Sequence, residues 1–192
     1  MHILLVGDSI RIDYCQYVKD KLAGYATVGF SEDNARFSKN VLFFIRHWIS
    51  LHGENADVVV LNCGLWDVVH MWDAEYTITS IDEYRSDLEK TVGQIRAALP
   101  NAKIIWATTT PVDEQGNRAS RPDHMRYNKD ICAFNDCAVE LMRSLDCEIC
   151  DLHAVIQNQP LPLWKDGVHY IAKGCELLAD AVVEKIRSVI NL

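Results

Sequence analysis

Short apolar segments alternate with helix-like segments along the whole chain, and this alternation constrains the fold more than any other feature of the sequence. Residues 58–61 read Val-Val-Val-Leu, a continuous apolar run that is typical of a strand buried on both faces of a parallel sheet. Strands are predicted over residues 2–6, 25–30, 57–63, 103–108 and 148–152, and helices over 14–22, 38–51, 80–99, 127–145 and 171–190. Because strands separated by helices form βαβ units, we predict a parallel five-stranded sheet covered by helices on both faces.

Three connections between these elements are predicted to be irregular, at residues 65–80, 110–126 and 154–168. The last two each hold two prolines, which interrupt regular structure. The chain shows no internal repeat and no low-complexity linker. We therefore predict one domain over residues 1–192.

The charge and composition of the chain exclude several classes of protein. Its formal net charge is −8, so it offers no basic surface for nucleic acid. No apolar run approaches the roughly 18 residues of a membrane span, so membrane insertion is not expected. The first seven residues have the length and flanks of a buried strand rather than of a signal peptide. We expect a cytoplasmic protein, or a chain trimmed of its leader, and the composition leaves the oligomeric state open.

Seven cysteines are scattered along the chain, and this odd number does not suggest a disulfide framework. Cys147 and Cys150, with His153 nearby, raise the alternative of a metal site. The segment also fits a strand with alternating apolar and polar residues, and no second pair of ligands stands near it in the sequence. We expect reduced, mostly buried thiols, and neither a metal nor an organic cofactor.

Polar residues of interest follow several of the predicted strands. Ser9 follows the first strand, Asn34 and Ala35 follow the second, and residues 64–67 follow the third. Asp166 and His169 lie on the connection after the fifth strand. Ligands of parallel α/β sheets bind beyond the carboxyl ends of the strands, so we expect all of these residues on one rim of the sheet.

Ser9, His169 and Asp166 have the chemistry of a catalytic triad. A serine hydroxyl becomes a strong nucleophile when a base takes its proton, and that base needs a third group to orient it. Histidine suits the role of base near neutral pH, and Asp166 stands three residues before it, within reach of its far ring nitrogen. Read one at a time, Ser9 fits a helix cap and Asp166 a surface turn. Their joint placement on one rim favours the triad.

The two ends of the chain resemble the SGNH (GDSL-like) serine esterases. Gly7-Asp8-Ser9-Ile10 is similar to the family's G-D-S-L block, and Asp166-Gly-Val-His169 is similar to its D-x-x-H block. The resemblance implies a three-layer αβα fold with a flavodoxin-like sheet, and ester hydrolysis through an acyl-enzyme. Supporting similarities lie in Thr108-Thr-Thr-Pro111 and at Asn128 and Asn135.

Two blocks depart from the pattern of this family in the region of the oxyanion hole. The family's second block provides a glycine N–H, and the matching residue here is Ala35. The third block usually reads G-x-N-D, but here Trp66 stands in the place of the asparagine. We expect the N–H groups of Ser9 and Ala35 to bind the oxyanion, with Trp66, Asn62 or Asn34 as candidates for a further donor.

The favoured function is hydrolysis of carboxylic esters through Ser9. Small acyl or acetyl esters, including those of carbohydrates, are the preferred substrates; thioesters and lysolipids also suit the chemistry. Trp66, Trp72 and Trp164 either wall a substrate or pack the rim loops.

Other functions and roles remain open from the sequence. Because of Trp66, the main alternative is a weakly active or inactive binding protein with the same fold. A nucleotide-binding domain is a further alternative, although no glycine-rich phosphate loop is present. Arg118, Arg121 and Arg126 lie on a connection that either is solvated or meets an anionic substrate.

Overall fold

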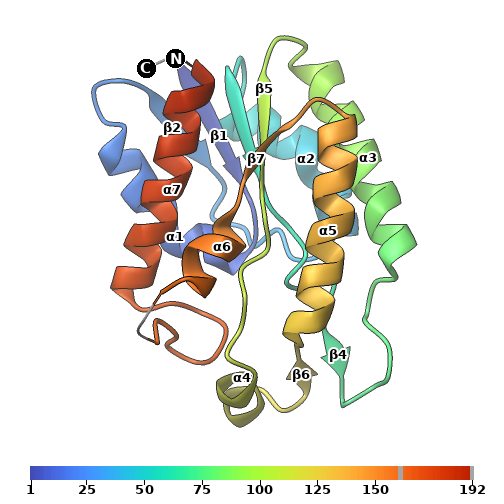
Figure 1. Cartoon of the computed structure of the whole chain (residues 1–192). Helices are drawn as coiled ribbons and strands as arrows, with labels where there is room; N and C mark the ends of the chain where they lie inside the picture. The colour runs from blue at the N-terminus through green and yellow to red at the C-terminus, as the bar shows by residue number, and fades with distance from the viewer. Residues whose placement is uncertain (160–161, 191–192) are drawn as a thin grey trace.

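The central sheet of this computed structural model, which describes residues 1–159 and 162–190, contains five parallel strands. The strands are β1 (His2–Val6), β2 (Thr27–Phe30), β3 (Val58–Leu61), β5 (Lys103–Ala107) and β7 (Glu148–Cys150). Their order across the sheet is β2-β1-β3-β5-β7, the flavodoxin-like order (Figure 1). All five predicted strands are present, and the predicted fold class is confirmed.

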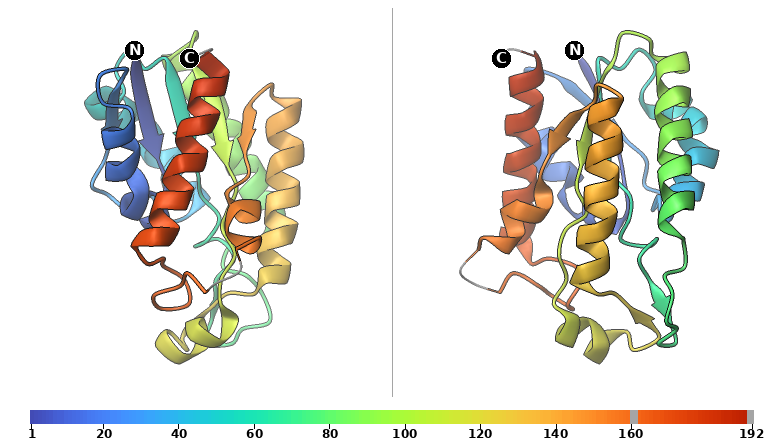
Figure 2. Two further views of the ribbon diagram at one scale, coloured as in Figure 1. Left: turned by 60° about the vertical axis from the view of Figure 1, so that its left-hand side comes forward. Right: turned by 45° about the vertical axis from the view of Figure 1, so that its right-hand side comes forward.

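Helices cover both faces of the sheet and make three layers (Figure 2). On one face α1 (Ser9–Lys21) packs against α7 (Ala172–Ile190), which also contacts the short α6 (Leu152–Gln157). On the other face α3 (Ile81–Ala98) packs against both α2 (Ser38–His52) and α5 (Asn128–Ser144). The inner strands β1, β3 and β5 are almost entirely apolar and buried, as a doubly covered sheet requires, whereas the edge strands β2 and β7 are only partly buried.

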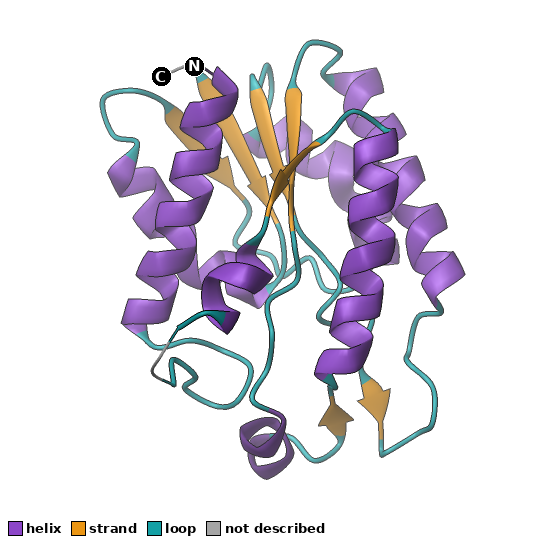
Figure 3. Ribbon diagram, viewed as in Figure 1, coloured by secondary structure: helices purple, strands orange, loops and turns teal. Residues whose placement is uncertain are grey.

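Four short elements lie in segments that the sequence analysis predicted to be irregular. Two-residue strands β4 (His70–Met71) and β6 (His124–Met125) pair antiparallel, and α4 (Glu114–Ser120) precedes β6. The fourth is α6; residues 160 and 161 of that connection lie outside the described chain. These elements are too short to show an apolar period. Figure 3 shows α4, β4 and β6 among the loops beyond the carboxyl ends of the main strands.

The N-terminal turns of two helices begin at residues that matter for the rim. Helix α1 starts at Ser9, five residues before its predicted start, because the Asp8 side chain caps it by accepting the N–H of Ile10 at 3.0 Å. Helix α2 starts at Ser38 itself, with Phe37 in the cap position. The N–H and the hydroxyl of Ser38 both donate to Asp67.

All seven cysteines are free, and five of them are buried. In the described parts of the chain, no three His, Cys, Asp or Glu side chains come together as a metal site. Cys147 and Cys150 contact backbone carbonyls of Leu145 and Ala181, whereas His153 contacts Cys132. Within the same described residues, no helix combines the length and apolar character needed to cross a bilayer.

Candidate active site

Ser9 occupies the sharp turn between β1 and α1. Asp8, which is only 1% exposed, caps the helix, so Ser9 is its first residue and its side chain remains available to other partners. A Cβ at Gly7 would lie 2.7 Å from the Cβ of Arg11, which explains the glycine at this turn. Among the described residues the Ser9 N–H has no protein acceptor, as expected in the first turn of a helix. An N–H donor and a hydroxyl therefore meet at the positive end of α1.

The three residues of the predicted triad lie in hydrogen-bond contact. The Nε2 atom of His169 is 2.9 Å from the Oγ atom of Ser9, although 160 residues separate them in the sequence. The Nδ1 atom of His169 is 2.8 Å from the Oδ2 atom of Asp166. The other carboxylate oxygen of Asp166 accepts the backbone N–H groups of Val168 and His169. The carboxylate thus fixes both the ring and the backbone of His169.

The environment of Asp166 keeps its carboxyl ionised. Burial acts to raise its pKa, but the hydrogen bonds from the backbone and ring of His169 and from the Val168 N–H outweigh burial and hold the pKa at about 2. An ionised Asp166 can orient His169 and stabilise its charged form.

The low pKa of Asp166 predicts a specific dependence of stability on pH. Since the folded-state pKa lies below the ordinary value of 3.8, the ionised carboxyl stabilises the fold above about pH 4, and this stabilisation is lost as the pH falls through about 2. In urea unfolding, the difference in stability between wild type and Asp166→Asn should narrow as the pH falls through this window. If the free energies of unfolding of the two proteins changed in parallel with pH, the hydrogen bonds described for Asp166 would be contradicted.

The connection that carries Asp166 and His169 is held by the connection after β5. The Ser120 hydroxyl donates to the Asp166 carbonyl at 2.6 Å, and the Asp113 N–H donates to the Gly167 carbonyl at 2.8 Å. The hydroxyl of Tyr170 donates to the Pro111 carbonyl at 2.7 Å. The connection over residues 110–126, which the sequence predicted to be irregular, therefore supports the triad.

Asn128 and Asn135 fix the same connection from α5. Asn135 exchanges two hydrogen bonds with the backbone of Thr109, both 2.8 Å, and Asn128 exchanges two with the backbone of Val112, both 2.9 Å. Each amide side chain satisfies a backbone donor and a backbone acceptor at once. These asparagines position the loop that supports Asp166.

The predicted oxyanion donors differ in their availability. The N–H of Ala35 donates to the Gly7 carbonyl at 3.2 Å, and the amide of Asn62 donates to the Ala107 carbonyl at 2.9 Å. Asn34 accepts the N–H of Arg36 at 2.9 Å. The N–H of Ala35 already has an acceptor, which weakens its predicted role as an oxyanion donor. The amide of Asn62 uses one of its two N–H groups for Ala107, so its role as a donor stays a prediction. The Ser9 N–H is a backbone donor for which the described residues provide no acceptor.

Trp66 lies among aromatic and cationic side chains. Its ring meets Phe37 edge-on with centroids 5.6 Å apart. The guanidinium carbons of Arg36 and Arg126 each lie 5.9 Å from the ring centroid. Among the described residues its indole N–H has no protein acceptor. The residue that replaces the family's asparagine is thus in contact with two positive charges.

Asp67 in the same block has a structural role. Both of its carboxylate oxygens accept the N–H of Ser38 at 3.0 Å, and one accepts the Ser38 hydroxyl at 2.7 Å. Burial raises the pKa of Asp67 to about 6 even though the Ser38 bonds oppose the increase. This contact ties the connection after β3 to the start of α2.

The remaining candidates from the sequence lie away from Ser9 or have other partners. Trp72 is 77% exposed, and the Trp164 ring packs against Tyr170. Arg118 pairs with Asp73 at 3.1 Å. Arg126, for which the sequence left open a solvated position or contact with an anionic substrate, is buried beside Trp66, and no spacing in the sequence signals this.

A Ser–His–Asp cluster at the carboxyl edge of a flavodoxin-like sheet defines the class of SGNH hydrolases. The sequence model of the GDSL-like lipase/acylhydrolase family matches residues 5–177, and the chain belongs to this family. The protein is therefore an ester-hydrolysing enzyme, as the two end blocks predicted. Curated protein sequences give no significant match to the chain.

Solved structures share the fold over nearly the whole chain. The lipase/acylhydrolase from Enterococcus faecalis has a TM-score of 0.78 at 22% identity, covering 98% of this chain and 96% of its own. A carbohydrate acetylesterase family member from Sinorhizobium meliloti has a TM-score of 0.78 at 18% identity, covering 100% and 99%. An acetyl xylan esterase has a TM-score of 0.75 at 19% identity, covering 97% and 100%. At these identities the similarity shows the fold.

Proposed function

We propose that the enzyme hydrolyses small acyl esters, acetyl esters of carbohydrates in particular, through an acyl-enzyme on Ser9. The observation that carries the proposal is the continuous hydrogen-bonded path from Asp166 through His169 to Ser9, with distances of 2.8 and 2.9 Å. Such a path activates a serine hydroxyl, and neither a metal nor an organic cofactor takes part in it.

In the first half of the reaction, the Nε2 atom of His169 takes the hydroxyl proton while the Oγ atom of Ser9 bonds to the ester carbonyl carbon. The carbonyl π electrons move to oxygen, and the Ser9 N–H at the start of α1 binds the resulting oxyanion. When the tetrahedral intermediate collapses, the bond to the alcohol breaks and His169 gives its proton to the leaving alkoxide. The acyl group remains on Ser9.

In the second half, water replaces the alcohol. His169 takes a proton from water as its oxygen attacks the acyl-enzyme, and then returns the proton to Ser9 as the carboxylic acid departs. Throughout, the ionised Asp166 stabilises the imidazolium. One ester and one water are consumed, and one alcohol and one acid are formed.

An open surface groove that reaches Phe37 but contains no triad residue in its lining supports a carbohydrate as the alcohol part of the substrate. Phe37 contacts Trp66 and also lines this groove, whose volume is about 540 Å³. Phe43 adds a second aromatic ring, and Lys39, Asn40 and Glu83 add polar groups. Sugars present apolar faces and hydroxyl edges, and both find partners here. Two of the proteins with the same fold are described as a carbohydrate acetylesterase family member and an acetyl xylan esterase.

A fluorophosphonate probe tests the role of Ser9. We expect the wild-type protein to form one covalent adduct, located on Ser9 by peptide mass spectrometry, and to release acetate from acetylated xylan oligosaccharides. The Ser9→Ala variant should do neither. Ser31, a buried serine after β2, provides the matched control, and Ser31→Ala should label like wild type.

Two results would count against the proposal. Absence of labelling in a folded wild-type protein would favour the alternative of an inactive binding protein with this fold. Labelling that persists in Ser9→Ala would place the nucleophile elsewhere. A single domain over residues 1–192 and a cytoplasmic location stay predictions from the sequence.

A further inference from the structure

Arg126 is a buried cation with no carboxylate partner. Arg126 is only 4% exposed. Within the described residues, no Asp or Glu oxygen lies within 4.0 Å of its guanidinium nitrogens. Its Nε–H donates to the Leu65 carbonyl at 2.6 Å, and Nη1 donates to the His124 carbonyl at 3.1 Å. Because a buried unpaired charge is costly, its presence calls for a reason beyond packing.

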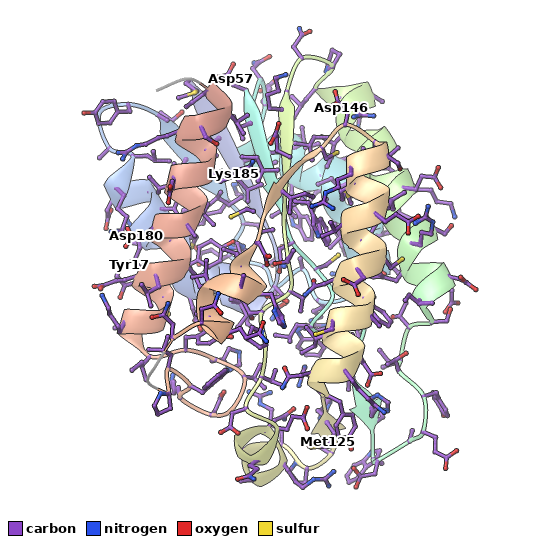
Figure 4. The ribbon with its side chains drawn as sticks, viewed as in Figure 1. Tyr17, Asp57, Met125, Asp146, Asp180 and Lys185 are labelled. Carbon is purple, nitrogen blue, oxygen red and sulfur yellow. The ribbon has the colours of Figure 1, made fainter. Side chains whose placement is uncertain are left out.

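The position of Arg126 places this charge at the active site. It directly follows β6, and Figure 4 shows its neighbour Met125 beyond the carboxyl ends of the main strands. Its guanidinium carbon lies 5.9 Å from the centroid of Trp66. Burial raises the pKa of Asp8, and the charge of Arg126 is among the influences that oppose the increase. Burial lowers the pKa of Arg126, and the charge of the Asp166 carboxylate opposes this decrease. Leu65, whose carbonyl accepts a hydrogen bond from Arg126, lines the same small cavity as Asp8, the residue before Ser9.

The way in which Arg126 is held suits a fixed electrostatic role. A guanidinium has five N–H donors, and the two carbonyl contacts leave others free. The Leu65 carbonyl belongs to the block after β3 in which the family places its asparagine donor. A cation that is already oriented and shielded from water stabilises developing negative charge without reorganisation during the reaction.

We propose that Arg126 is a catalytic residue whose guanidinium stabilises the oxyanion formed on Ser9, in the role that the asparagine has where Trp66 now stands. The inference rests on the proposed acyl-enzyme mechanism and adds a group to it. Trp66 covers the guanidinium with an apolar ring, which strengthens the effect of the charge by excluding water. No further covalent step is required, since Arg126 only donates hydrogen bonds to an oxygen that already carries the charge.

Binding of an anionic substrate is the main alternative role for this charge. Arg36 lies at the same distance from Trp66 and is exposed, so a pair of cations is present. A substrate carboxylate is best bound by an exposed guanidinium with both of its terminal N–H groups free. Arg126, however, is buried and bonded to two carbonyls. The experiment below separates the two roles by comparing a neutral ester with an anionic one.

The test compares Arg126→Gln and Arg126→Lys with wild type on p-nitrophenyl acetate. Glutamine removes the charge, and we expect kcat to fall by about 10²–10³-fold while KM changes much less. Lysine keeps the charge but loses the planar fork, so its kcat should lie between those of glutamine and wild type. The rate of phosphonylation of Ser9 should follow the same order. Melting temperatures and circular dichroism establish that each variant is folded.

The matched control is Arg118→Gln, the same substitution on the same connection. Arg118 pairs with Asp73 on the surface, so its loss should leave kcat unchanged. A second comparison restores an amide at position 66. If Arg126 replaces the family's asparagine, Trp66→Asn should recover part of the activity that Arg126→Gln loses.

Several outcomes would overturn the inference. A folded Arg126→Gln variant with wild-type kcat would remove Arg126 from the reaction. Equal losses for lysine and glutamine would assign Arg126 to holding the Leu65 and His124 carbonyls. A loss confined to KM for mono-p-nitrophenyl succinate, with p-nitrophenyl acetate unaffected, would assign it to substrate binding. If wild type itself neither labels nor turns over, the acyl-enzyme proposal fails, and the inference fails with it.

Discussion

Replacing His169 with alanine is expected to lower kcat by about 10⁴–10⁶-fold, the largest loss of activity that we predict for this chain. The substitution removes the base that lies 2.9 Å from the Ser9 hydroxyl, so the proton has no acceptor as Oγ attacks. Part of the rate should survive, because the N–H at the start of α1 still binds the oxyanion. Steady-state hydrolysis of p-nitrophenyl acetate, corrected for hydrolysis in buffer, measures the loss.

His153 provides the control for this experiment. It lies on α6, which directly follows β7, and its Nε2 atom is 3.8 Å from the Sγ atom of Cys132. His153→Ala should therefore keep the wild-type kcat. If His169→Ala kept substantial activity while remaining folded, another base would have to serve Ser9 and the proposed mechanism would be wrong.

The sequence predicted the sheet and the triad because both depend on local patterns. A buried parallel strand such as β3 has an unbroken apolar run. Ser9 lies where β1 turns into α1, and this local turn places it on the rim of the sheet. His169 and Asp166 are three residues apart, so their contact is local as well. Only the contact between Ser9 and His169, at opposite ends of the chain, depends on the topology, and the order of the βαβ units predicted it.

The support of the triad and the surroundings of Trp66 could not be predicted in this way. Arg126 and Leu65 are 61 residues apart, and their contact depends on how two irregular connections fold over the rim. Neither connection has an apolar period, so α4 and the β4–β6 pair left no signal in the sequence. Ala35 shows the same limit, because a backbone N–H is available or engaged according to packing that residue types do not record.

The long connection after β5 gives the site its rigidity. Its residues Asp113 and Ser120 bond to the backbone of the Asp166 connection, and Asn128 and Asn135 bond it to α5. A carboxylate that must hold His169 within hydrogen-bond reach of Ser9 needs such support, because small displacements of catalytic groups cost large factors in rate. Gly167 also packs directly against Gly116 and Asn117 of α4.

Gly167→Ala is expected to destabilise the protein by about 3–5 kcal/mol, the largest stability effect that we predict. Gly167 has a φ of +82°, in the left-handed region, and a Cβ there would collide with the backbone of Gly116 and Asn117 in α4. Neither neighbour is the end of a flexible side chain, so the two connections must separate. Asp166 would move with them, and kcat of the folded variant should fall as well.

Gly24 isolates the effect of the collision from that of the backbone conformation. Its φ is +84°, almost the same as that of Gly167, but a Cβ there would meet no atom within 4 Å. Gly24→Ala should therefore cost only about 1 kcal/mol, the price of the left-handed conformation, and leave kcat unchanged. Urea unfolding of both variants measures the difference. Equal losses of stability would show that close packing of the Asp166 connection against α4 contributes little, and the support proposed for the triad would have to lie in its hydrogen bonds alone.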